Sequence, residues 1–401
     1  MAGQLQGPRP LYVITGQPTG WNRGSIPKLQ AIFTSAAPTG PADLHTRLLA
    51  EQAQRWEAAT GVRPEDTHLT IIMPIRNEEK SLPSALGALL LSDLPTAADV
   101  VVVFVTNACS DNSAALVMCY LEALGKVELR HFAGRSGDPH LKRQHAAVQV
   151  DNMTFLHFDT PTPGKANALT IGNAVALQRG HVVAISVDAN NYLEPDAIRI
   201  MFGEARAAFT QVPGGIVLLS VGETKDWKAS STTTFFKYAG TIPTGITDNE
   251  GIVNGWCMAW DIAWVERIGG VPAVAAEDYA LGVKARLGGY GHRRVPAART
   301  WGYAPSGLRD ALSARARLVR GQLQLLAQDP STRPIMDGDT HYLRPFLGRI
   351  RTLGDWLRDY LRAVPALLAH FALWEVALLL GRQAHRRDPH NQSWAAVRST
   401  L

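Results

Sequence analysis

Residues 69–79 read Leu69-Thr70-Ile71-Ile72-Met73-Pro74-Ile75-Arg76-Asn77-Glu78-Glu79, an apolar run that changes abruptly into a polar turn. Such a run, ended by a turn, is typical of a strand buried on both faces of a parallel sheet. Open parallel sheets bind ligands at the carboxyl ends of their strands. We therefore expect Arg76, Asn77 and Glu78 to border a ligand site, although Asn77 and Glu78 can equally serve as helix caps.

The same pattern repeats along the chain and predicts the fold class. Apolar runs at 69–73, 100–105 and 181–187 are followed by stretches at helical spacing, at 82–91, 114–124 and 195–209. This order is typical of βαβ units and predicts an α/β protein with a doubly wound, mostly parallel sheet and helices on both faces. Residues 134–164 and 225–254 break the pattern, and we expect two long loops that cover the carboxyl edge of the sheet.

Composition narrows the class of protein. A chain of 401 residues with 46% hydrophobic residues can bury a large core, which excludes disorder for most of its length. The formal charge is only +5, and the basic residues gather after Arg293, so we expect no nucleic-acid partner. The three cysteines show no Cys-x-x-Cys spacing, and residues 1–35 do not have a signal-peptide pattern, so we expect a cytoplasmic protein.

Two further sites have residue types suited to a nucleotide. Asn107 and Asp111 lie in the turn after the second apolar run, where they can contact a nucleobase or cap the next helix. Lys165 follows Gly164 at the start of an Ala-rich helix, where an ammonium group and free backbone N–H groups can meet a diphosphate. A solvated lysine is the alternative interpretation of that position.

The remaining candidate site residues are three carboxylates and one neighbouring amide. Asp188 ends the apolar strand at 182–187, and a buried carboxylate is costly unless it is paired or binds a metal ion. Asn190 lies two residues later, on the same face of an extended chain, and such oxygen ligands suit Mg²⁺ or Mn²⁺. Glu277 and Asp278 open a helix, where carboxylates are also favoured by the helix dipole.

Taken in order, these blocks resemble the glycosyltransferase family 2 domain, which has the GT-A fold. The resemblance covers residues 69–324 and rests on 74–78, 107–113, 164–169, 188–190, 191–195, 254–259, 268–270, 277–278 and 317–321. It implies three regions: an N-terminal arm and leader helix at 1–67, a GT-A domain at 68–325 and a basic, amphipathic helical extension at 326–401.

The resemblance also implies roles for individual residues. It implies that a nucleotide-sugar donor is held by Pro74, Arg76, Asn77, Glu78, Asn107, Asp111, Lys165 and Asp188. Arg317 and Arg320 recur on a predicted helix, where they can contact donor phosphates or an anionic acceptor or form a solvated basic face. Asp188 and Asn190 take the positions of the metal ligands, with Mg²⁺ or Mn²⁺ as the cofactor. Asp278 takes that of the catalytic base beside Glu277, while Gly255, Trp256 and Cys257 lie on the acceptor side. The implied reaction is a direct displacement that inverts the anomeric carbon.

Departures from the family pattern limit these expectations. Asn190 replaces the usual second aspartate, which weakens the metal site and leaves a catalytically silent nucleotide-sugar-binding or scaffold protein as an alternative. Residues 314–318 lack the Gln and Trp of processive polysaccharide synthases, so we expect transfer of a single sugar. A nucleotidyltransferase is less favoured because 74–78 is not a Gly-rich phosphate loop. We favour UDP over GDP as the carrier, and a small molecule, a lipid phosphate and a peptide remain open as acceptors.

The C-terminal region has a different pattern. Apolar side chains recur at helical spacing through residues 353–380, with arginines among and after them. Two interpretations stay open: a helix on an anionic membrane surface, which would make the protein peripheral on the inner membrane face, or a helix that packs into a core or homo-oligomer contact.

Overall fold

The structure is a computed structural model that describes residues 53–94, 98–131, 144–150, 152–227, 253, 255–303, 308–340 and 364–391. The predicted N-terminal arm, most of the predicted leader helix and most of the predicted loop at 225–254 lie outside these residues. The described end of the leader, helical at 53–60, packs on the domain: Trp56 is fully buried, donates to Thr67 Oγ1 over 2.9 Å and stacks on Phe202.

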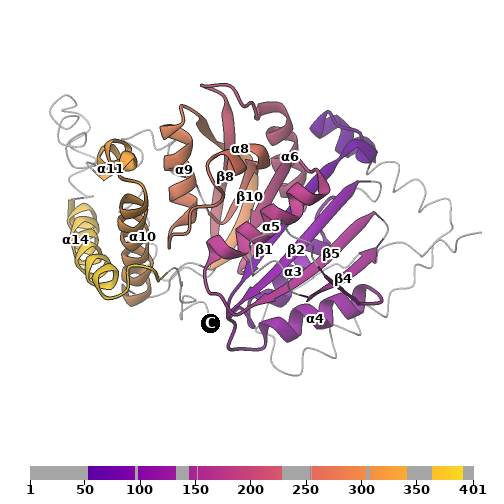
Figure 1. Ribbon diagram of the computed structural model, residues 1–401, viewed down its shortest axis with the longest axis horizontal. Coiled ribbons are helices and arrows are strands. Elements are labelled where there is room, and N and C mark those ends of the chain that lie inside the picture. The colour runs from indigo at the N-terminus through magenta and orange to yellow at the C-terminus, as the bar shows by residue number, and fades with distance from the viewer. Residues whose placement is uncertain are drawn as a thin grey trace, which may run out of the picture.

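A ten-stranded sheet forms the centre of the described chain (Figure 1). In spatial order its strands are β3 (Glu128–His131), β4 (Gln144–Val150), β5 (Met153–Thr160), β2 (Asp99–Asn107), β1 (His68–Ile75), β6 (Val183–Val187), β9 (Cys257–Asp261), β8 (Ile216–Trp227), β10 (Gly291–Tyr303) and β7 (Asn191–Leu193). Strands β4, β7 and β9 run antiparallel to their neighbours, and the others point the same way. The predicted α/β fold with a mostly parallel sheet is confirmed.

Helices cover both faces of the sheet, as predicted. The side chains of Leu69, Ile71 and Met73 in β1 pack into a core with α3 (Leu82–Leu90), α4 (Ser113–Leu124) and α6 (Ala197–Ala208). Ile72 points to the other face, which is covered by α5 (Lys165–Arg179), α8 (Ile262–Arg267) and α9 (Glu277–Leu287). Because successive side chains of a strand alternate between faces, an uninterrupted apolar run such as β1 supplies both cores.

The prediction of a long loop at 134–164 was wrong in its second half. Strands β4 and β5 form an antiparallel hairpin there, and β5 pairs in parallel with β2. The hairpin includes His145 and His157, which made the segment look polar, yet both are buried. His145 stacks on Phe158, and His157 contacts the hydroxyl of Thr106 at 2.8 Å, so neighbouring strands accommodate both rings. Strand β8 likewise continues to Trp227, into the second predicted loop.

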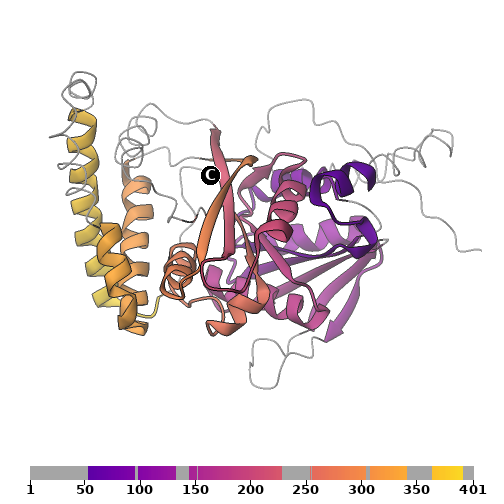
Figure 2. The same ribbon diagram turned by 90° about the horizontal axis from the view of Figure 1, so that it is seen from above.

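The C-terminal helices that the structure describes lie at one end of the sheet, where the first and the last of them pack against each other (Figure 2). They are α10 (Leu308–Gln328), α11 (Arg333–Thr340) and α14 (Val364–Arg387). Gly321 of α10 lies so close to Ala276, just before α9, that a Cβ there would come within 2.6 Å of the Ala276 backbone. Gly381 of α14 approaches Val319 of α10 in the same way. Among the described helices, none has the length and apolar composition needed to cross a bilayer.

The contact between α5 and β1 gives a test of the packing. A Cβ at Gly172 would lie 2.5 Å from the fully buried Ile72 side chain, so Gly172→Val overpacks the interface. We expect it to lower the free energy of unfolding by about 1–3 kcal/mol in chemical denaturation. The matched control is Gln178→Val, which places the same side chain on an exposed position of the same helix. Equal stability of the two variants would contradict this packing.

Candidate functional site

The turns after β1 and β2 are tied together at the carboxyl edge of the sheet. Asn77 has a positive φ of 55°, and its side-chain oxygen accepts the backbone N–H of Ser110 over 2.8 Å. Asp111 accepts the N–H groups of Glu79 and Ser113, each over 3.0 Å. The polar atoms of Asn77 and Asp111 thus hold the two turns against each other, a role that differs from the helix capping offered as the alternative from the sequence.

Asn107 connects three elements at this edge. Its amide donates to the Ile75 carbonyl at the end of β1, and its oxygen accepts the N–H of Gly164 over 3.0 Å just before α5. The side chain is fully buried. Asn107 therefore fixes the start of α5, and with it Lys165, relative to the ends of β1 and β2.

Two predicted residues of the first turn keep groups that a ligand can use. The Nη1 atom of Arg76 is buried and has no hydrogen-bond partner among the described residues, an arrangement that costs free energy unless an anion or polar ligand completes it. Glu78 is 5% exposed and accepts the Ser81 hydroxyl over 2.6 Å. Burial raises the pKa of Glu78 to about 7, against the lowering effect of Ser81. Pro74 lies within β1, buried opposite Val105.

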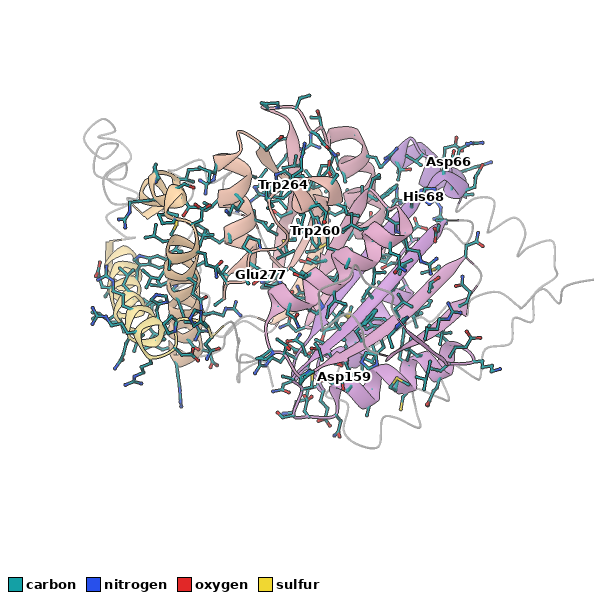
Figure 3. All side chains as sticks on the ribbon, viewed as in Figure 1. Asp66, His68, Asp159, Trp260, Trp264 and Glu277 are labelled. Atoms are coloured by element: carbon teal, nitrogen blue, oxygen red, sulfur yellow. The ribbon has the colours of Figure 1, made fainter. Side chains whose placement is uncertain are left out.

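Lys165 is the centre of the site. Its Nζ lies 2.6 Å from Asp188 Oδ1 and 3.2 Å from Glu277 Oε1, and it donates to the Gly255 carbonyl over 2.9 Å. The Lys165 side chain is only 10% exposed. One buried ammonium therefore joins the start of α5, the end of β6, the start of α9 (Figure 3) and the segment before β9.

The electrostatics of this cluster are governed by burial and by opposite charge. Burial by itself would lower the pKa of Lys165, but Asp188, Glu277 and Asp278 together raise it above its ordinary value, so the ammonium stays charged. Burial raises the pKa of both Asp188 and Glu277, and Lys165 opposes that rise. Asp278 adds negative potential to each of these three groups, which places it in the same site.

Asp278 is held differently from Glu277. Its Oδ1 accepts the backbone N–H of Tyr279 over 2.8 Å, and the side chain is partly exposed, whereas Glu277 is buried. A Cβ on Gly255 would lie 2.3 Å from Asp278 Oδ2, so only glycine allows this carboxylate to lie against the backbone at 255. Glu277 thus pairs with Lys165, and Asp278 presents a second oxygen beside Gly255.

Asn190 lies next to Glu78, whose pKa is raised by burial and in part by the charge of Asp188. Its amide nitrogen is 3.4 Å from Glu78 Oε1. The backbone carbonyl of Trp256 accepts both the Asp188 N–H over 3.0 Å and the Asn191 side-chain amide over 2.9 Å. Asn191 was not among the predicted site residues, although it directly follows the Asp188-Ala189-Asn190 block.

The remaining predicted residues lie at the border of the site. Trp256 is partly exposed, but the Cys257 side chain is fully buried in β9, and burial raises the pKa of its thiol to about 12. Cys257 therefore offers an acceptor no reactive side chain. Arg317 is exposed on α10 and exerts positive potential on Asp188 and Glu277, so it belongs to the surroundings of the cluster. Arg320 is partly buried beside Arg317 and feels the charge of Asp388.

No protein-family model matches the chain, and no curated protein matches it. Among solved structures, the mannosyltransferase PcManGT from Pyrobaculum calidifontis, in complex with GDP-Man and Mn²⁺, aligns at 18% identity over 91% of this chain and 100% of its own, with a TM-score of 0.49.

Two further structures align less closely. Glucosyl-3-phosphoglycerate synthase from Mycobacterium tuberculosis, with Mg²⁺ and UDP, aligns at 12% identity over 72% of this chain and 84% of its own, with a TM-score of 0.41. S. aureus TarS 1-349, with UDP-GlcNAc, aligns at 15% identity over 79% and 92%, with a TM-score of 0.38. All three structures were solved with a nucleotide or nucleotide sugar. All three TM-scores lie below 0.5.

The buried cation gives the sharpest test of the site's energetics. We expect Lys165→Met to lower the free energy of unfolding by about 3–5 kcal/mol at pH 8, because it leaves the Glu277 carboxylate, only 7% exposed, and the partly exposed Asp188 without their cation. The pKa values of Asp188 and Glu277 are already raised in the folded state, so protonation relieves the loss as the pH falls, and the deficit should be smaller at pH 5. Denaturant unfolding at both pH values measures this.

The control for that test is Lys284→Met. Lys284 also forms an ion pair, with Asp329, but both side chains are partly exposed, at 22% and 25%. We expect a cost of about 1 kcal/mol or less there. A deficit in Lys165→Met that matched the control, or that did not change with pH, would contradict the buried-cluster account.

Proposed function

We propose that this protein is a glycosyltransferase that moves one sugar from a nucleotide diphosphate sugar to an acceptor, with inversion at the anomeric carbon. The observation that carries the proposal is the single cluster formed by Lys165, Asp188, Glu277 and Asp278 at the carboxyl edge of the sheet. The ammonium group balances part of the carboxylate charge around it, and the more accessible carboxylate of Asp278 beside it can act as a base.

Asp278 is the base in this proposal. It takes the proton from the acceptor's nucleophilic group, which attacks the anomeric carbon and forms the new glycosidic bond. The bond between the anomeric carbon and the diphosphate breaks, and its electron pair leaves with the nucleoside diphosphate. Glu277 is a positioning residue, because its carboxylate is buried against Lys165 and not presented beside Gly255.

Lys165, Arg76 and Arg317 supply positive charge for the leaving diphosphate. The three N–H donors of Lys165 are taken up by oxygens of Asp188, Glu277 and Gly255, so its charge acts on the diphosphate through space. The group is fixed and needs no reorganisation during the reaction, which favours electrostatic stabilisation of developing charge. The unpartnered Nη1 of Arg76 provides a further donor at the turn after β1. The turns after β1 and β2 would then hold the nucleoside, with UDP as the first carrier to test.

The donor set also fits a divalent cation. Asp188 offers a carboxylate with one oxygen beyond its contact to Lys165, and Asn190 offers an amide carbonyl; oxygen ligands of this kind suit Mg²⁺ or Mn²⁺ bound together with a diphosphate. The three carboxylates outnumber the one lysine in the cluster, so its charge does not repel a cation. When bound, the metal would neutralise charge on the donor diphosphate.

The assignment of the base is tested by Asp278→Asn. We expect nucleoside diphosphate release in the presence of acceptor to fall by about 100-fold or more, while calorimetry shows unchanged donor binding. The control is Asp66→Asn, at an exposed position remote from the cluster, where activity should stay unchanged. A screen of UDP and GDP sugars, with and without Mn²⁺, selects the donor. Donor binding without turnover, unaffected by Asp278→Asn, would favour a silent binding protein instead.

The acceptor is proposed to lie at an anionic membrane surface. Helix α14 exposes Val376, Leu379 and Leu380, at 44%, 66% and 41%, on one face. Arg386 and Arg387 follow on that face and are exposed. Apolar and basic side chains on one helix face are the combination that binds anionic lipid, and a lipid phosphate is an acceptor such a surface would supply.

Binding of α14 to an anionic membrane surface is tested by Leu379→Glu. We expect the variant to co-sediment less with anionic liposomes than the unchanged protein, because it places a negative charge on the apolar face of α14. Leu129→Glu is the matched control, since Leu129 has nearly the same exposure, 65%, on strand β3. If the unchanged protein does not sediment with liposomes but dimerises in a Leu379-dependent way, the face is a homo-oligomer contact.

A further inference from the structure

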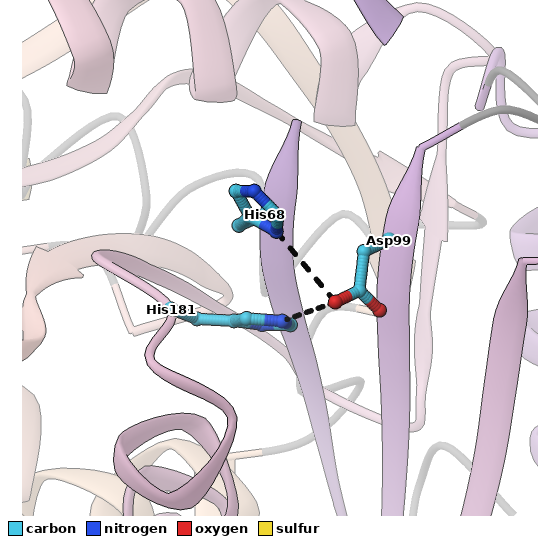
Figure 4. A group of neighbouring side chains, drawn as sticks. All are labelled: His68, Asp99 and His181. Atoms are coloured by element: carbon cyan, nitrogen blue, oxygen red, sulfur yellow. Dashed lines mark hydrogen bonds and ion pairs between the residues drawn. The ribbon is translucent and has the colours of Figure 1, made fainter. Parts of the chain in front are cut away.

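A second cluster of metal-ligating side chains lies at the opposite, amino edge of the sheet (Figure 4). His68 is the first residue of β1, and Asp99, directly opposite it in the register, is the first residue of β2. His181 precedes β6, the other neighbour of β1. Because these three strands run parallel, their amino ends meet at one edge. Asp188 follows the far end of β6, so this cluster is separate from the candidate active site.

The distances in the cluster are close to those of a metal site. Asp99 Oδ2 lies 3.3 Å from His181 Nε2 and 3.6 Å from His68 Nδ1, and the three ligand atoms all lie within 4.8 Å of one another. Tetrahedral zinc, with ligand bonds of about 2.0–2.1 Å, places neighbouring ligand atoms about 3.3–3.4 Å apart. Only a small closing movement of the exposed His68 ring is needed to reach that geometry.

A second contact orients the buried histidine. His181 Nδ1 lies 2.8 Å from the hydroxyl of Thr70, and Thr70 is fully buried in β1. In the structure Nε2–H faces the Asp99 carboxylate at 3.3 Å; with a cation bound, Nδ1 would donate its proton to Thr70 and Nε2 would present its lone pair to the ion. Metal-bound histidines are commonly oriented in this way through their second ring nitrogen.

Burial across the cluster leaves access for an ion. The His181 side chain is fully buried, whereas those of Asp99 and His68 are 38% and 52% exposed. The site is thus rigid on its inner side and open to solvent on its outer side. Two imidazoles and a carboxylate favour zinc or a similar transition metal over Mg²⁺, which prefers oxygen ligands alone.

We propose that His68, Asp99 and His181 bind one zinc-class cation, with water completing the coordination shell. The bound ion would join the starts of β1 and β2 to the connection between α5 and β6, and so would stabilise the fold without contacting the donor. The proposal does not depend on the glycosyltransferase function.

The test uses the full-length protein, freed of metal by a chelator and without nucleotide sugar. Calorimetric titration should show one Zn²⁺ per chain, Co²⁺ should give the visible absorption of a tetrahedral site, and Zn²⁺ should raise the melting temperature where Mg²⁺ does not. We expect His68→Gln to lower Zn²⁺ affinity at least about tenfold, and Thr70→Val to lower it by about 10–100-fold.

Two further variants make the outcome decisive. His390→Gln removes an exposed histidine elsewhere and should leave Zn²⁺ binding unchanged. Asp188→Asn should also leave it unchanged, because that residue lies at the other edge of the sheet. His68 is exposed enough for its variant to fold. The proposal is overturned if Zn²⁺ does not bind stoichiometrically, if His68→Gln binds it as tightly as the unchanged protein, or if Asp188→Asn alone abolishes binding.

Discussion

The buried ammonium of Lys165 is the interaction on which the active edge of this protein depends. The Glu277 carboxylate is costly to bury alone, and a single cation within 3.2 Å of both Glu277 and the partly exposed Asp188 offsets that cost. The same cation fixes the Gly255 carbonyl. The Lys165 ammonium contacts Asp188, Glu277 and Gly255, so it joins four separate segments of the chain. Asp278, next to Glu277, lies beside the cluster as a result.

The packing of the sheet places that cation. Helix α5 lies against β1 closely enough that Gly172 meets Ile72, and Asn107 holds the N-terminal end of α5 to the ends of β1 and β2. Because α5 is fixed both against β1 and at its N-terminal end, Lys165 is held at one position. The parallel strands also divide the molecule, because the carboxyl edge carries the charged cluster and the amino edge carries His68, Asp99 and His181.

Continuous apolar runs made the central strands predictable from the sequence. The hairpin of β4 and β5 lacks such a run, and the sequence did not predict it. The strands β1, β2 and β6 are buried on both faces, so their sequences are continuously apolar and could be recognised without a structure. His145 and His157 interrupt the hairpin's pattern, but Phe158 and the Thr106 hydroxyl accommodate their rings. From the sequence alone, a buried polar side chain with a partner in a neighbouring strand cannot be distinguished from a solvated one.

The sequence by itself determined the α/β class, the polar turns at the strand ends and the presence of Lys165, Asp188, Glu277 and Asp278 as candidates. Only the tertiary structure decided that Glu277 is buried against Lys165 while Asp278 lies beside Gly255, that Asn77 and Asp111 serve to join two turns, and that two histidines and an aspartate meet at the opposite edge. The physical reason is that strand and helix periodicity is a local property of the chain, whereas charge pairing and burial depend on which distant segments the sheet brings together.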